Sequence, residues 1–361
     1  MSINIASKFR IGAAMAASNL FKVRKPITTQ ILVTKKCNMN CKMCFVYPVN
    51  KKEKMLNSKE PTLKELTSLI DQSCRLGAQV IVPFGGEPLI REDIKDIIHE
   101  INIRKRFSML YTNGTFVPSR IKDILEVDQL CISVDGDEKT HDSIRGKGAY
   151  KRAIEALEAG LEHGLVCRLH TALIPDTIDS LPHMAELAKK YNVILNYGSC
   201  DATAQTKSVE DKFSLTRKQV VEFLELYAKY KREGYPISSP LRVIEECKRL
   251  MEVWPIDSGM LSKEEEEKHR LLKIPACALW FSNLYIDSDG SAYPCLPLWG
   301  KQFNPPNVYD VSVKEAWEHY ADLPCHQCAS IFTIEKSLFY SFNIASILDY
   351  VAGYRFLSSK K

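Results

Sequence analysis

The middle of the chain alternates short apolar segments with amphipathic ones, a pattern that few folds accommodate. Residues 29–34, 79–83, 108–112, 129–134, 166–171 and 193–197 are rich in Val, Ile or Leu and predict strands. Helical patterns lie between them, near 62–76, 91–104, 118–126, 149–163 and 178–191. Strands that alternate with helices form a parallel sheet with covered faces. Functional sites in such sheets form at the carboxyl ends of the strands.

Both ends of the chain predict apolar helices with basic residues nearby. Residues 1–25 form one amphipathic pattern that Pro26 ends, with a stripe made of Ile5, Phe9, Ala13, Ala16 and Leu20. No Asp or Glu precedes Glu53, whereas ten Lys or Arg residues do. Such a segment can be a transit peptide, an arm on an anionic surface or an ordinary surface helix. The apolar stretch 331–357 is expected either to lie on a membrane surface or to pack on the barrel, and the same two alternatives apply to residues 1–25.

The composition gives no indication of a membrane-spanning or nucleic-acid-binding protein. Among 361 residues, 26% are charged, and no window of 18 uninterrupted apolar residues predicts a transmembrane span. A net charge of +5 is too small to indicate nucleic-acid binding. The twelve cysteines are clustered in a large chain without a good signal peptide, which favours metal ligands over a disulfide framework.

Three of these cysteines follow the first predicted strand within eight residues. Cys37, Cys41 and Cys44 form a C-x3-C-x2-C run. A [4Fe–4S] cluster normally takes four thiolates, so a loop with three leaves one iron open to a ligand. A zinc site is the alternative, but no fourth ligand lies nearby in the sequence.

A second motif follows the second strand, and with it the sequence resembles the radical S-adenosylmethionine (SAM) superfamily. The motif is Gly85-Gly86-Glu87-Pro88, about 40 residues after the cysteines. The resemblance implies that this segment holds the amino group of the methionine moiety. Glycines permit a close approach of the backbone, and a carboxylate accepts hydrogen bonds from an ammonium group. The resemblance also implies that the open iron chelates SAM and that an electron from the cluster releases a 5′-deoxyadenosyl radical.

Further residues near strand ends extend the resemblance. Asn113 lies in a Thr-Asn-Gly turn after the third strand, where a bare turn is the alternative. The resemblance implies that Ser133 lies near the ribose and Arg145 near the methionine carboxylate. Met43 stands where an aromatic residue often stacks near adenine, and its sulfur can contact the ring instead. Ile174 is expected either to contact adenine or to belong to the core.

A second group of cysteines lies near the carboxyl terminus. Cys277 and Cys295 bracket a predicted hairpin whose strand 281–286 turns through residues 287–290, and Cys325 and Cys328 follow. Four thiolates complete a cluster. The pattern resembles the twitch form of the SPASM-type extension, which implies one auxiliary [4Fe–4S] cluster. Four thiolates also suit a structural zinc ion, so that alternative stays open.

The remaining cysteines are mostly expected in the core. Cys200 differs because it follows the sixth strand, on the catalytic side of a parallel barrel. Its thiol is a candidate hydrogen-atom donor to a substrate radical, and an inert loop or core thiol is the alternative.

The resemblance covers about residues 30–330 and implies an α/β fold, a partial (β/α)6 TIM-like barrel with a small twitch-type domain. We divide the chain into an N-terminal helix (1–28), the barrel (29–200), a helical connector (201–273), the cluster domain (274–330) and a C-terminal apolar helix (331–361).

The resemblance implies a radical SAM enzyme but does not name the substrate. Because only 28 residues precede the first strand, we expect no N-terminal peptide-binding module and favour a sugar, cyclitol, lipid or isoprenoid. Maturation of a ribosomal peptide and a non-catalytic iron–sulfur or zinc protein are the alternatives. We expect a cytoplasmic location, with peripheral membrane contact as an open possibility, and an electron donor such as flavodoxin or ferredoxin.

Overall fold

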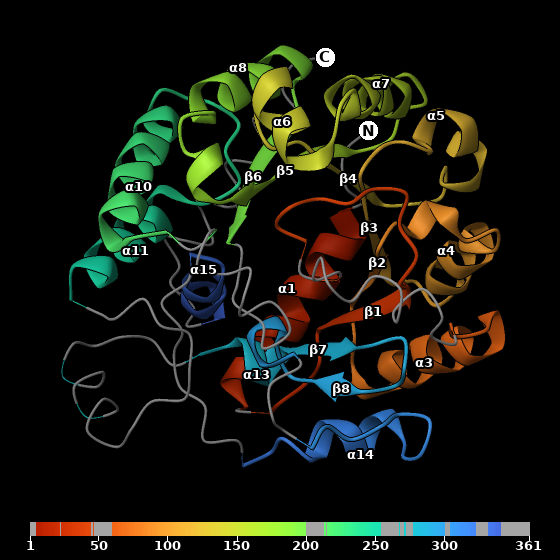
Figure 1. The fold of residues 1–361 in the computed structure, drawn as a ribbon. Helices are drawn as coiled ribbons and strands as arrows, with labels where there is room; N and C mark the ends of the chain where they lie inside the picture. The colour runs from red at the N-terminus through yellow and green to blue at the C-terminus, as the bar shows by residue number, and fades with distance from the viewer. Residues whose placement is uncertain are drawn as a thin grey trace.

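A computed structural model gives the fold (Figure 1). It describes residues 5–21, 23–44, 46, 60–199, 213, 215–253, 267, 271, 277–299, 304–322 and 331–340.

The six predicted strands form one parallel sheet. They are β1 (Thr28–Thr34), β2 (Val80–Gly85), β3 (Phe107–Thr112), β4 (Gln129–Ser133), β5 (Cys167–Leu173) and β6 (Ile194–Ser199). Neighbours in sequence are neighbours in the sheet, which runs in the order β6-β5-β4-β3-β2-β1. The partial (β/α)6 barrel expected from the sequence is therefore confirmed.

Helices cover the outside of this sheet (Figure 1). The expected ones are α3 (Leu63–Leu76), α4 (Ile94–Ile103), α5 (Val117–Arg120), α7 (Ala149–Glu162) and α8 (Leu181–Tyr191). Short 3₁₀ turns lie at Pro88–Ile90, Ile121–Asp123, Pro175–Thr177 and Leu296–Leu298. Sequence analysis missed α6 (Glu138–Arg145), which buries only His141 and Ile144 and so has no apolar stripe. Asp137 begins it by accepting a hydrogen bond from the Thr140 amide.

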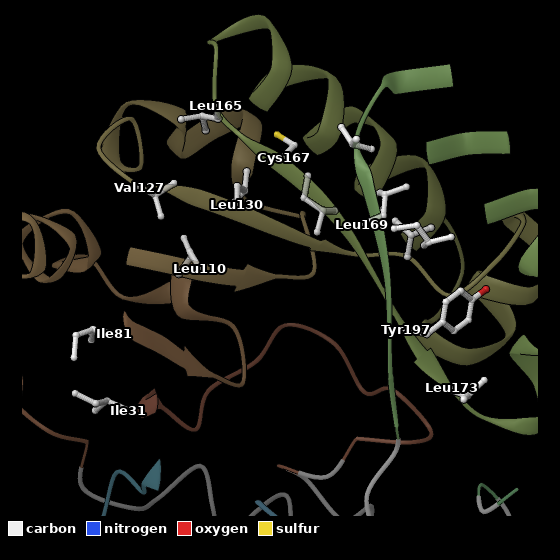
Figure 2. Packing of buried hydrophobic residues seen from close by; sticks show 14 of the residues in the cluster. Ile31, Ile81, Leu110, Val127, Leu130, Leu165, Cys167, Leu169, Leu173 and Tyr197 are labelled. Carbon is white, nitrogen blue, oxygen red and sulfur yellow. The ribbon is translucent and has the colours of Figure 1, made fainter. Parts of the chain in front are cut away.

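The main core lies between the sheet and these helices. Figure 2 shows Leu110, Leu130 and Leu169, from β3, β4 and β5, on this side of the sheet. Along β5 burial alternates: the side chains in the core are buried, whereas Arg168, His170 and Ala172 on the other face are partly exposed. Side chains of β5 on the inner face of the barrel are thus less buried than those on the outer face.

The C-terminal hairpin continues the barrel sheet. The strand expected over 281–286 is shorter, because α13 (Leu279–Ser282) precedes β7 (Asn283–Ile286). β7 pairs parallel with β1 and antiparallel with β8 (Ala292–Tyr293), as the predicted turn requires. The other helices are α10 (Arg217–Arg232), α11 (Leu241–Val253), α14 (Val313–Glu318) and α15 (Ile331–Tyr340). The domain boundaries stay predictions.

The N-terminal helix α1 (Ile5–Leu20) lies at the amino ends of the strands. Ala14 and Met15 pack against Ile27, the residue before β1, and Ala278, the residue before α13. The charge of Arg10 acts on Asp128, the residue before β4. The helix therefore closes the barrel at the end opposite the motif loops. No helix in the described part of the chain is long and apolar enough to cross a membrane.

Arg24 ties the segment after α1 to the C-terminal part of the chain. Its guanidinium lies 4.8 Å from the ring centroid of Trp280 and 4.3 Å from that of Trp317. It also donates hydrogen bonds to the carbonyl oxygens of both tryptophans, at 3.2 Å and 3.4 Å. Burial between these groups lowers the pKa of Arg24 to about 10.

We predict that Arg24→Ala lowers the free energy of unfolding by about 2–4 kcal/mol, because two ring contacts and two hydrogen bonds are lost together. The matched control is Arg75→Ala, whose exposed ion pair with Asp71 should be worth under about 1 kcal/mol. Urea unfolding followed by circular dichroism measures both. Equal effects of the two substitutions would contradict the bridging role.

Candidate functional site

The first cysteine run lies in the loop at the carboxyl end of β1. Cys37, Cys41 and Cys44 are free thiols with intermediate exposure. Cys37 and Cys44 pack against one apolar cluster, which contains Tyr285 of β7 and Trp299, whereas Cys41 packs against another. Burial raises the pKa of the Cys37 thiol to about 12. Binding to a metal centre would oppose this shift, since a metal ligand is a thiolate.

The two glycines of the second motif allow its backbone to touch the start of the cysteine loop. A Cβ atom on Gly85 would lie 2.2 Å from the carbonyl oxygen of Thr34. A Cβ atom on Gly86 would lie 2.2 Å from the carbonyl oxygen of Lys36. The amide of Gly86 donates to the Thr34 oxygen at 2.9 Å, so the contact is also hydrogen-bonded. Only glycine fits at either position without moving this loop.

Glu87 joins three loops from a fully buried position. Its amide donates to the Lys36 oxygen at 2.8 Å. Its carboxylate accepts from the Leu89 amide at 3.1 Å, the Thr112 hydroxyl at 2.9 Å and the Asn113 amide at 2.8 Å. Burial raises the pKa of Glu87 to about 7, even though these hydrogen bonds act in the opposite direction. A carboxylate offers about four acceptor positions, and these donors use three of them.

Asn113 connects the loop after β3 to the cysteine loop. Its side-chain amide donates to the Asn38 oxygen at 2.8 Å, and its own oxygen accepts from the Thr115 amide. Asn113 is thus more than a turn residue. Pro88 begins the 3₁₀ turn that follows Glu87 and is buried.

Arg145 lies beside Cys41 and forms an ion pair with Asp135. The distance from Arg145 Nε to Asp135 Oδ2 is 2.5 Å, and both side chains are largely buried. Burial alone would raise the pKa of Asp135, but the Arg145 guanidinium holds it below its ordinary value. The Cys41 thiol is also hydrogen-bonded to Arg145, which moderates the increase in pKa that burial causes.

His141 supports this ion pair from behind. Its Nδ1 accepts a hydrogen bond from the Asp135 amide at 2.9 Å, so the proton of the neutral ring is on Nε2. Burial lowers the pKa of His141 to about 4. Sequence analysis did not assign Asp135 or His141 to the site. The sequence signal that could have identified them is their position, because Asp135 precedes the glycine after β4 and His141 lies four residues before Arg145.

Met43 and Ile174 belong to one small apolar cluster. Both are buried and pack together with Ile144, and Cys41 borders the cluster. The structure therefore brings together the two residues expected near adenine, although they are 131 positions apart in the sequence.

The inner face of the sheet offers polar groups next to this cluster. Ser133, at the end of β4, is partly exposed and pairs in register with His170 of β5. Asn196 donates from Nδ2 to the Ser238 hydroxyl at 3.1 Å, which directs its oxygen at His170 Nδ1, 2.9 Å away. His170 Nδ1 therefore carries the proton and Nε2 is an acceptor. Burial lowers the pKa of His170 to about 4, so the ring is neutral near pH 7. Sequence analysis did not identify His170, because it lies inside a strand without a motif.

The C-terminal cysteines are described only in part. Cys277 and Cys295 are buried free thiols in one apolar cluster with Leu279 and Leu298. Cys325, Cys328 and Cys200 lie outside the described residues. Among the residues that are described, no three His, Cys, Asp or Glu side chains lie close enough to hold one metal ion. Three thiolates that bind three irons of a cube need not converge on a single atom.

Comparison with known proteins agrees with the geometry. Residues 31–188 match the family described as Radical SAM superfamily. The chain is 27% identical over 234 residues to Fe-coproporphyrin III synthase of Methanosarcina barkeri, covering 63% of this chain and 57% of the relative. It is 25% identical over 211 residues to GTP 3′,8-cyclase of Clostridium perfringens, covering 57% and 64%. The chain thus spans less than two thirds of the length of these relatives.

Two solved structures share the fold. SuiB of Streptococcus suis bound to precursor peptide SuiA aligns with a TM-score of 0.65 at 14% identity, over 90% of this chain and 74% of the other. A histidine-tagged form of anSMEcpe with bound AdoMet aligns with a TM-score of 0.61 at 16% identity, over 92% and 98%. At such identities the likeness concerns the fold alone.

We predict that Gly86→Ala lowers the free energy of unfolding by about 2–4 kcal/mol, because the new methyl group meets fixed backbone atoms of Lys36. Gly12→Ala is the matched control. Nothing lies within 4 Å of a Cβ there, so alanine in the middle of α1 should stabilise the protein by about 0.5–1 kcal/mol. Chemical denaturation gives both values, and a harmless Gly86→Ala would show that the close approach is not required.

Proposed function

We propose that this chain, whose residues 31–188 match the radical SAM superfamily, cleaves SAM reductively and abstracts hydrogen from a non-peptide substrate. Cys37, Cys41 and Cys44 would hold the catalytic [4Fe–4S] cluster. When bound, the cluster supplies the electron that breaks the sulfonium bond of SAM and yields a 5′-deoxyadenosyl radical. The other steps depend on groups of the chain that bind, orient and shield the reactants.

The observation that carries this proposal is the buried Glu87 carboxylate. Glu87 lies next to the start of the cysteine loop, because its amide N–H donates a hydrogen bond to the Lys36 carbonyl oxygen. Its carboxylate accepts three hydrogen bonds and keeps one further acceptor position. A buried carboxylate with three neutral donors is well suited to an ammonium group, because the added cation compensates for the cost of burying the charge. We propose that Glu87 binds the methionine amino group, with Gly85, Gly86 and Pro88 shaping the loop.

The remaining SAM contacts are proposed from position. Arg145 is hydrogen-bonded to the Cys41 thiol and held in place by its ion pair with Asp135. Its guanidinium group suits the methionine carboxylate while it keeps that ion pair. Met43 and Ile174 offer an apolar surface for adenine. Ser133 lies at the carboxyl end of β4, where a ribose hydroxyl would find a polar partner, and Asn113 steadies the cysteine loop.

We assign an auxiliary [4Fe–4S] cluster to Cys277, Cys295, Cys325 and Cys328. The proposal is supported by the shared burial of the first two, which lie at opposite ends of the β7–β8 hairpin. Cys200 stays a candidate hydrogen-atom donor.

A small substrate is supported by the polar inner face of the sheet. His170 Nε2 can accept a hydrogen bond from a hydroxyl or amine group, and Tyr111 packs edge-on against the same ring. The relatives named for porphyrin and nucleotide products also favour a small molecule over a peptide. Peptide maturation is the second candidate, since SuiB shares the fold and binds the precursor peptide SuiA in its crystal structure. We further propose a cytoplasmic enzyme reduced by flavodoxin or ferredoxin, with peripheral membrane contact.

We predict that SAM cleavage depends on Cys41 and that SAM binding depends on Glu87. With dithionite under anaerobic conditions, the wild type should release 5′-deoxyadenosine and methionine, and Cys41→Ala should release neither. Glu87→Ala should bind SAM at least about tenfold more weakly, because the ammonium group loses its charged partner. Cys74→Ala, on the buried face of α3, is the control that should keep activity. Undiminished cleavage by Cys41→Ala, measured by liquid chromatography, would refute the mechanism.

We predict that the iron content reports two clusters. Reconstituted protein should hold about eight irons, and Cys277→Ala/Cys295→Ala should hold about four. Cys247→Ala, a fully buried cysteine of α11, should leave the content unchanged. Elemental analysis decides the question. About four irons and one zinc ion in the wild type would replace the auxiliary cluster with a structural zinc site.

A further inference from the structure

The helix α1 exposes its largest described apolar side chains to solvent. Phe9 and Leu20 are 76% and 73% exposed, and Phe21, directly after the helix, is 70% exposed. Ala13 lies between them on the same side and is also exposed. Among the side chains of α1 that the structure describes, Ser7 and Ser18 are buried, and the partly buried Ala14 and Met15 pack against Ile27 and Ala278. A surface helix normally packs its large apolar side chains on the core instead.

These three large side chains are the most exposed apolar residues in the first half of the described chain. Leaving them in water forgoes the free energy of burial, so an arrangement of this kind indicates a surface that another phase or molecule covers.

Charge identifies what covers it. The first 52 residues contain ten Lys or Arg and no Asp or Glu. Arg24 is occupied by two tryptophan rings, but Lys8, Lys22 and Lys25 are neighbours of the apolar residues in the sequence. A segment that combines an exposed apolar helix face with several cations and no carboxylate in its own sequence complements the headgroup layer of an anionic bilayer.

We propose that the face of α1 formed by Phe9, Ala13, Leu20 and Phe21 docks on an anionic membrane surface. Because α1 closes the amino end of the barrel, the candidate site opens at the opposite end of the strands. The docked enzyme therefore presents its site to the aqueous phase, and its substrate arrives from solution or is lifted clear of the bilayer. The proposal depends on α1 alone and not on the radical chemistry.

Co-sedimentation of the full-length, cluster-loaded protein with phosphatidylglycerol-containing vesicles tests this surface. The wild type should bind at low salt and much less at about 0.5 M salt, where charges are screened. Phe9→Ser/Leu20→Ser/Phe21→Ser should bind at least about tenfold more weakly, since a large apolar side chain taken out of water contributes about a tenfold step. Lys8→Glu/Lys22→Glu/Lys25→Glu should lose binding to the same vesicles.

The matched control is Ile103→Ser/Leu125→Ser, which removes two apolar side chains of 55% and 47% exposure elsewhere on the surface. It should bind vesicles like the wild type. SAM cleavage by every variant should be unchanged, which separates this surface from the active site. Absence of vesicle binding by the wild type would overturn the proposal. So would a wild-type dimer that the triple serine variant converts to a monomer without vesicles, because a second copy would then cover the face.

Discussion

A single buried carboxylate holds the functional end of this barrel together. Glu87 accepts hydrogen bonds from the segments after β2 and β3, and its amide bonds to the segment after β1. The carboxylate has no exposed surface, so each of these donors offsets part of its desolvation. Because Gly85 and Gly86 precede it without side chains, the backbone comes close enough for the network to form.

Separate interactions connect the barrel to the β7–β8 segment and to the segment after α1. At the carboxyl end of the strands, Lys35 forms an ion pair of 3.1 Å with Asp287 in the β7–β8 turn, and Trp299 donates to the same carboxylate. At the amino end, Arg24 lies between two tryptophan rings. The cysteine loop is thus held by the β7–β8 segment as well as by the barrel.

Much of the site could be read from the sequence because its chemistry is local. Cys37, Cys41 and Cys44 fall within eight residues, and the Gly-Gly-Glu-Pro motif is contiguous. The six strands were predictable for the same reason, since each is a short run of apolar residues. The helix α6 was missed because it buries only two side chains and has no apolar stripe. His170 was missed because its partner, Asn196, is 26 positions away in a different strand.

The sequence by itself predicted a class of chemistry and determined the order of the barrel elements, because thiolate spacing and hydrophobic period act over a few residues. Tertiary structure decided what depends on distant segments. It paired β7 with β1 and directed the Asn196 oxygen at His170. It also turned the apolar stripe of α1 outward, a result that the helical period of the sequence does not fix. A stripe defines a face, and only the shape of the surface beneath the helix decides which face packs against it.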